Sequence, residues 1–218
     1  MATALAAIHP TFASWSQQAD TARQANLPFC AMPPKLDELT KTIESGRHVA
    51  DVAREVMADL GYSFSAWNGI KGPIGVWFRM NVGAYTATPR FPNQVHFMFR
   101  RVEEANQDLL DPKIMKAVLL TLIDAWEPDW ALLTDENYAQ ALVERGPLPL
   151  PLFRAGWMTY LAAPHARKFR APPEAIIEPV AGGGILISAT RDRFTIDDPD
   201  HVFVADAIQE ALTQLRVD

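Results

Sequence analysis

Two stretches in the first half of the chain alternate apolar and polar residues with a period of two. The stretch IGVWFRMNVGAYT at 74–86 has its apolar positions at Ile74, Val76, Phe78, Met80 and Val82. The stretch NQVHFMFR at 93–100 repeats the pattern with Val95, Phe97 and Phe99. Because successive side chains of a strand point to opposite faces, this period is typical of strands with one buried face. The short TPRFPN segment between the two stretches predicts a hairpin, and hence an antiparallel sheet.

The stretch DPKIMKAVLLTLIDAW at 111–126 is apolar on nearly every side, which predicts a buried central helix. Its first residues, Asp111 and Pro112, suit the N-cap and the first helical position. Apolar residues at helical spacing predict flanking helices at 35–60, 135–145 and 199–216. The first of these is expected to break at Gly46 and to end at Gly61. Short strands are expected at 130–133, 155–161, 175–180 and 184–190.

These elements together predict an α+β fold with a mainly antiparallel sheet, a buried central helix and flanking helices. With 218 residues, of which 49% are apolar, the chain is long enough for one sizeable core. The proline-rich segment RGPLPLPLF at 145–153 is too apolar for a solvated linker and is interpreted as an extended segment packed on the body. A single domain spanning residues 1–218 is therefore expected.

Three consecutive glycines, Gly182 to Gly184, are interpreted as a hairpin turn. They lie between two predicted strands, whereas a phosphate-binding loop needs its glycines between a strand and a helix. The Asp198–Pro199 pair that follows matches the start of a helix, as at Asp111–Pro112. Neither segment therefore predicts a metal or phosphate site.

No residue pattern predicts catalysis. The chain has one cysteine and five histidines, and it lacks both a G-x-S-x-G elbow and an H-E-x-x-H motif. No cofactor and no metal are expected, and the favoured interpretation is a protein that is not an enzyme. Two alternatives stay open: a small hydrolase or transferase built from scattered carboxylates and His165 with Arg167, Lys168 and Arg170, or a structural subunit of an assembly.

The net charge of −6 is concentrated in two acidic blocks. Residues 102–145 hold ten Asp or Glu against three Lys or Arg, and residues 180–218 hold seven against three. Because nucleic acid needs a basic surface, these blocks argue against nucleic acid as a direct ligand and favour a basic partner. The sequence shows neither a secretory signal nor a membrane span, so a cytoplasmic protein is expected.

The tryptophans divide between core and surface positions. Trp77, Trp126 and Trp157 fall inside strand or helix patterns and are expected in the core. Trp130 lies within the acidic stretch IDAWEPDWALLTDEN at 123–137. An exposed aromatic among carboxylates is typical of a protein-binding hot spot, and the alternative is a core aromatic beside a solvated acidic rim.

Three motifs of the second half occur in a recognisable order. They are GWMTYL at 156–161, EPVAGGGILISAT at 178–190 and RFTIDDPDHV at 193–202, followed by the final helix. This succession, over residues 154–215, resembles the immunity protein 52 family of polymorphic-toxin immunity proteins. The matching landmarks are Gly156, Trp157, Tyr160, Gly183, Gly184, Phe194, Asp198, Pro199 and His201.

The resemblance implies an antitoxin that binds a cognate toxin of the same bacterium. Toxins associated with the family include nuclease effectors, some of them delivered by type VI secretion. A nuclease holds phosphates with Lys and Arg, so the acidic blocks predict an inhibitor that occludes a basic toxin surface. The oligomeric state stays open. The candidate toxin-binding residues are Glu103, Glu104, Asp108, Asp129, Trp130, Asp135 and Glu136.

Overall fold

The computed structural model describes most of the chain in eight stretches. They are residues 1–17, 28–29, 35–49, 55–70, 75–86, 93–99, 108–145 and 153–215. The chain divides into two compact units, Met1–Leu109 and Leu110–Asp218, and an antiparallel sheet lies in each. The predicted α+β class with antiparallel pairing is confirmed. A single domain over 1–218 stays a prediction.

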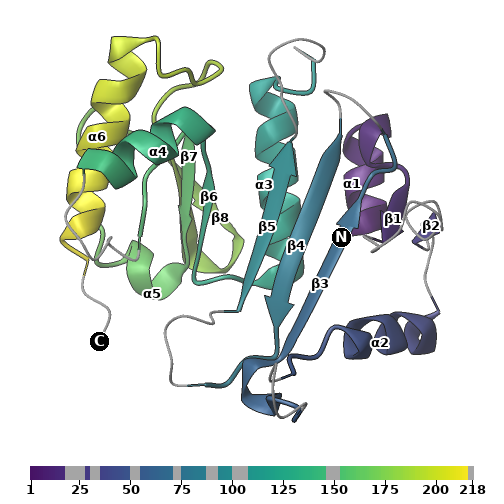
Figure 1. The fold of residues 1–218 in the computed structure, drawn as a ribbon. Coiled ribbons are helices and arrows are strands. Elements are labelled where there is room, and N and C mark those ends of the chain that lie inside the picture. The colour runs from purple at the N-terminus through teal and green to yellow at the C-terminus, as the bar shows by residue number, and fades with distance from the viewer. Residues whose placement is uncertain are drawn as a thin grey trace. The chain divides into compact units, whose positions relative to one another are not determined.

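Unit 1 is built on a sheet with the strand order β2-β1-β3-β4-β5. Its strands are β1 (Trp15–Gln17), β2 (Pro28–Phe29), β3 (Tyr62–Trp67), β4 (Val76–Val82) and β5 (Gln94–Phe99). Its helical segments are α1 (Ala2–Ile8), η1 (Pro10–Phe12), α2 (Leu36–Ser45) and η3 (Ala58–Leu60). Figure 1 shows β3, β4 and β5 as the long arrows of this unit.

The predicted hairpin of β4 and β5 is confirmed, and one of its faces forms the core of unit 1. The pairs Val76↔Phe99, Phe78↔Phe97 and Met80↔Val95 lie across the two strands. The buried Trp15 ring meets Phe78 edge to face, with 5.2 Å between ring centroids. Edge-to-face aromatic pairs add stability beyond the area that they bury.

The predicted helix over 35–60 is wrong beyond Gly46. Helix α2 ends at Ser45, and the backbone of Gly46 accepts a hydrogen bond from the Ser63 N–H at 2.8 Å. A Cβ at Gly46 would collide with the Ser63 carbonyl oxygen, so only glycine permits this approach. The chain then bridges to β3 through Arg47↔Tyr62. Gly61 follows the short η3 turn, and residues 50–54 lie outside the described stretches.

Unit 2 is built on a sheet with the strand order β6-β7-β9-β8. Its strands are β6 (Trp130–Leu133), β7 (Met158–Leu161), β8 (Ile176–Val180) and β9 (Gly184–Ser188). Its helices are α3 (Pro112–Trp126), α4 (Glu136–Arg145), α5 (Ala163–Ala166) and α6 (Pro199–Thr213). Figure 1 shows α3 on one side of this sheet and α4 and α6 on the other. All four residues of β7 are buried, as expected for a strand covered on both faces.

The predicted turn and helix starts of unit 2 are confirmed. Strands β8 and β9 pair through the short η4 turn (Ala181–Gly183), in which Gly182 and Gly183 have φ of 77° and 83°. The Asp198 side chain accepts hydrogen bonds from the Asp200 and His201 N–H groups, and Asp111 caps α3 in the same way. Helix α3 ends where Glu127 adopts a left-handed conformation, directly before Pro128. No helix within the described stretches combines the length and the apolar character of a bilayer span.

Candidate functional site

The net charge of the chain lies in unit 2. Residues 1–109 hold ten Lys or Arg and ten Asp or Glu, whereas residues 110–218 hold ten against sixteen. Surface charge of one sign steers a partner of the opposite sign. The search for a partner-binding surface therefore begins with the exposed carboxylates of unit 2.

The first group of carboxylates lies where α3 ends and β6 begins, and is called here the β6 surface. Asp124, Glu127 and Asp129 are all exposed. The main chain is held in place, because the Asp129 carbonyl accepts a hydrogen bond from the Ala162 N–H at 2.9 Å. Trp130 follows directly and is half-buried. The β6 surface thus combines three carboxylates with an aromatic on a fixed backbone.

Trp130 contributes both to packing and to the surface. Its ring meets the buried Phe153 edge to face, with 6.1 Å between ring centroids. It pairs with Leu161 across β6 and β7. One side of the indole therefore supports the unit while the remainder stays accessible to a partner.

Asp135 and Glu136 lie at the other end of β6. Asp135 Oδ1 accepts hydrogen bonds from the Asn137 and Tyr138 N–H groups at 2.9 and 3.2 Å, so Asp135 caps α4. Glu136 is exposed in the first turn of that helix. Because four strand residues span about 13 Å, the structure separates these two residues from Asp129 and Trp130.

The remaining predicted site residues lie elsewhere. Asp108 is exposed and belongs to unit 1. Glu103 and Glu104 lie outside the described stretches. Of the predicted site residues, the structure therefore brings together Asp129 and Trp130 at one end of β6, and Asp135 and Glu136 at the other end.

A second surface, called here the α6 surface, lies in the second acidic block of the sequence, but its exposed aromatic Phe203 was missed by sequence reasoning. Asp200, Phe203 and Glu210 are exposed on α6, and Phe203 is 63% exposed. Their spacing of three and seven residues places them along one side of the helix. The sequence signal was available: Phe203 lies off the apolar stripe of α6, whose residues Ala205, Ile208 and Leu212 are buried. A large aromatic off the stripe of its helix faces solvent.

Helices α4 and α6 are joined by a network that neutralises one acidic side chain. Asp206 on α6 accepts a hydrogen bond from the Tyr138 hydroxyl at 2.9 Å. The Arg145 guanidinium pairs with the same carboxylate at 3.0 Å. Burial raises the pKa of Tyr138 well above its ordinary value of 10, and the Asp206 charge raises it further. Asp206 therefore connects the two helices, and its charge is paired within unit 2.

The basic residues of the alternative enzymatic interpretation lie on or directly after the short helix α5. The His165 ring packs on Phe153, with 4.8 Å between ring centroids, while Arg167 and Arg170 are exposed. Within the part of the chain that the structure describes, no three His, Cys, Asp or Glu side chains gather as metal ligands do.

The sequence landmarks of the second half maintain the fold. A Cβ at Gly156 would lie 2.6 Å from the Leu133 carbonyl oxygen, and one at Gly184 would lie 2.6 Å from the Tyr160 ring. Phe194 is buried and meets the Tyr138 ring edge to face at 5.3 Å. These residues therefore identify the architecture and are not on the candidate surfaces.

The comparisons with known proteins agree with these motifs and extend them. The family model of immunity protein 52 matches residues 1–216, which includes both units and both candidate surfaces. No curated protein matches the sequence. Since the match covers almost the whole chain, the protein belongs to the immunity protein 52 family.

Proposed function

We propose that this protein binds a cognate bacterial toxin with nuclease activity and neutralises it by covering a basic surface. Membership of an immunity protein family supports a toxin as the partner. The observation that carries the electrostatic part is that the whole net charge of −6 lies in unit 2, where the β6 and α6 surfaces expose carboxylates. The protein then acts by binding and catalyses no reaction itself.

The charge argument follows from what a nuclease must do. Its substrate is a polyanion, so its cleft carries Lys and Arg that attract phosphates. An acidic inhibitor uses the same attraction, which raises its association rate and selects against partners of the wrong charge. Nucleic acid itself is then not a ligand of this chain. The proposed place of action is the cytoplasm, where a toxin delivered by type VI secretion meets its substrate.

The charged and the aromatic side chains of the two surfaces have different roles in this proposal. Exposed charges such as Asp124, Glu127 and Asp129 increase the association rate but add little affinity. Affinity comes from aromatic side chains that become buried on binding, here Trp130 and Phe203. The proposed contacts also include Glu136, Asp108 and the acidic residues Glu103 and Glu104. Asp135 contributes its negative charge while its side chain caps α4.

Occlusion is tested by competition. The toxin encoded beside the gene for this chain is purified, and its binding to a labelled nucleic acid substrate is measured with increasing amounts of the chain. The proposal predicts that the chain displaces the nucleic acid and that toxin cleavage stops in proportion. A stable complex of toxin, chain and nucleic acid together would contradict occlusion. A toxin that the chain neither binds nor inhibits would contradict the proposed function altogether.

The site assignment is tested with Asp129→Asn and Glu136→Gln, each combined with Trp130→Ala or left alone. Trp130 variants should shorten the lifetime of the complex, whereas charge variants should slow its formation. Asp197→Asn is the matched control, because this exposed carboxylate belongs to neither the β6 nor the α6 surface. Equal binding by all of these variants would remove the β6 surface from the proposal.

A further inference from the structure

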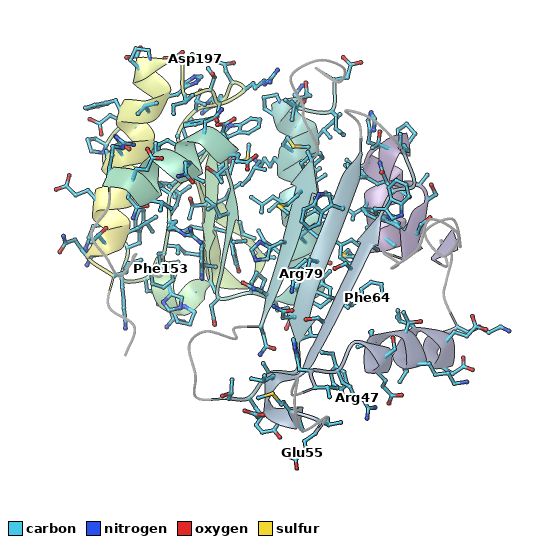
Figure 2. The ribbon with its side chains drawn as sticks, in the orientation of Figure 1. Arg47, Glu55, Phe64, Arg79, Phe153 and Asp197 are labelled. Carbon is cyan, nitrogen blue, oxygen red and sulfur yellow. The ribbon has the colours of Figure 1, made fainter. Side chains whose placement is uncertain are left out.

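The sheet of unit 1 has a second face that does not contribute to the core. It consists of three cross-strand rows on β3, β4 and β5: Trp67, Trp77 and Met98; Ser65, Arg79 and His96; Ser63, Asn81 and Gln94. We call these residues the outer face. The opposite face of β4 carries the buried residues Val76, Phe78 and Met80. Figure 2 marks Arg79 on β4, and Phe64 on the neighbouring β3.

The outer face is hollowed rather than flat. A hollow of about 330 Å³ is lined by Trp77, Arg79, Asn81, Gln94, His96 and Met98. This volume lies at the lower end of the range for binding pockets and suits a few side chains of a partner. Ser63 donates a hydrogen bond to Asn81 Oδ1 at 2.6 Å, which fixes the polar side of the face.

Two residues of the hollow are suited to binding a partner. The prediction that Trp77 belongs to the core is wrong: its indole lies half-exposed on the outer face beside Met98. Arg79 is exposed, and no carboxylate of the described residues forms an ion pair with it. Trp77 and Arg79 lie side by side on the outer face of β4, and tryptophan and arginine are among the residue types that most often contribute binding energy.

We propose that the outer face is a second docking site for the same toxin, an inference that rests on the proposed function. The face would bind a toxin segment in which a carboxylate lies beside an apolar side chain. The guanidinium of Arg79 forms a bidentate ion pair with the carboxylate. Trp77 and Met98 pack the neighbouring apolar side chain. The toxin is thus held by opposite charges on the two units: its cations face unit 2, and an anion faces unit 1.

Charge decides between this occupant and nucleic acid. Of the residues that form the outer face, Arg79 is the one Lys or Arg, and residues 1–109 carry no net charge. Nucleic acid binding requires several phosphate contacts by cations, which this face does not supply. A single carboxylate matches a single guanidinium.

The test is Arg79→Glu in the full chain, measured against the toxin from the neighbouring gene. If the basic toxin docks only on unit 2, an added negative charge leaves binding unchanged or accelerates association. If Arg79 pairs with a toxin carboxylate, the same change repels it, and the complex dissociates at least about tenfold faster. The two accounts therefore predict effects of opposite sign.

Lys41→Glu on α2 is the matched control, because it makes the same charge change at an exposed position outside the outer face. Its complex should keep the wild-type lifetime. Thermal melts show whether each variant is folded. If Arg79→Glu melts below the wild type, Arg79→Gln is measured instead. It removes the positive charge and keeps a polar side chain, so the same prediction holds with a smaller fold-change.

Three other outcomes would contradict the proposed docking site. If the complex of Arg79→Glu has the wild-type lifetime, the outer face is not a docking site. If α6 variants bind more weakly in the same assay, the proposed function still holds. A wild-type dimer in sedimentation that Arg79→Glu dissociates would show that a second copy covers the face. Binding of a fluorescent single-stranded RNA that depends on Arg79 would show that nucleic acid does.

Discussion

The hydroxyl of Tyr138 on α4 donates a hydrogen bond to Asp206 Oδ1 on α6, and the two atoms are 2.9 Å apart. Tyr138 is fully buried, and Arg145 neutralises the same carboxylate from the surface side. This contact holds α6 in the orientation that buries Ile208 and exposes Phe203. A hydrogen bond within unit 2 therefore supports the orientation in which α6 exposes Phe203.

Replacing Tyr138 with Phe tests this contact through alkaline stability. In the unfolded chain a tyrosine ionises from about pH 10, whereas burial raises the Tyr138 pKa in the folded state. The stability from keeping Tyr138 protonated is fully present below the unfolded pKa, and it is lost as the pH rises beyond that value. Tyr138→Phe should lower the free energy of unfolding by about 1 kcal/mol at neutral pH and reduce its alkaline decline.

The measurement is urea denaturation at several pH values on both sides of the tyrosine pKa. Tyr85→Phe is the control, because the Tyr85 side chain is 74% exposed and its loss should matter little. Parallel alkaline declines for the wild type and Tyr138→Phe would contradict the raised pKa of Tyr138, and equal unfolding free energies at neutral pH would show that the contact does not stabilise the fold.

Gly156→Ala should destabilise unit 2 by about 1–3 kcal/mol, because inserting a methyl group into a packed site forces displacement. The new Cβ would lie 2.6 Å from both the Leu133 carbonyl oxygen and the Leu132 Cδ1. Gly182→Asn is the contrasting change: Gly182 has a φ of +77° with nothing within 4 Å of an added Cβ, and asparagine tolerates this conformation. Chemical denaturation should therefore rank Gly156→Ala well below Gly182→Asn in stability. The reverse order would contradict the packing described.

Phe203→Ala should separate binding from stability. Because the side chain is 63% exposed, its removal should change the free energy of unfolding by less than about 0.5 kcal/mol. If Phe203 is a hot spot, toxin affinity should fall at least about tenfold, measured by calorimetry or surface plasmon resonance. Ile177→Ala on β8 removes a comparably apolar side chain, 39% exposed, and should leave affinity unchanged. Equal affinities for both variants would exclude the α6 surface.

Local patterns predicted the elements that depend on local physics. The period of two in 74–82 and 93–99 identified β4 and β5, and the Asp–Pro pairs at 111 and 198 marked the starts of α3 and α6. The helix predicted past Gly46 failed because that glycine pairs with Ser63, a contact between residues distant in sequence. Strand β3 was missed in the same region.

The candidate surfaces were less predictable than the fold. Net charge pointed to the acidic blocks, but only the structure shows that Asp135 caps a helix and that Asp206 is neutralised. Trp77 is expected in the core because it falls inside a strand pattern, but the alternation of that strand places it on the face opposite Phe78. Phe203 was not predicted, because the apolar pattern of α6 identifies the buried residues of the helix and not the exposed ones. Residue type predicted burial less well than position in the periodic pattern.

The central claim is that carboxylates of unit 2 attract a basic toxin. The most direct measurement is the association rate constant for the toxin over a series of salt concentrations. The triple variant Asp124→Asn, Glu127→Gln and Asp129→Asn is compared with a control triple on α2, Asp37→Asn, Glu38→Gln and Glu44→Gln, which removes the same charge from unit 1. The account predicts slower association and a flatter salt dependence for the first triple, with the control close to the wild type. Identical rates and salt slopes for both triples and the wild type would contradict it.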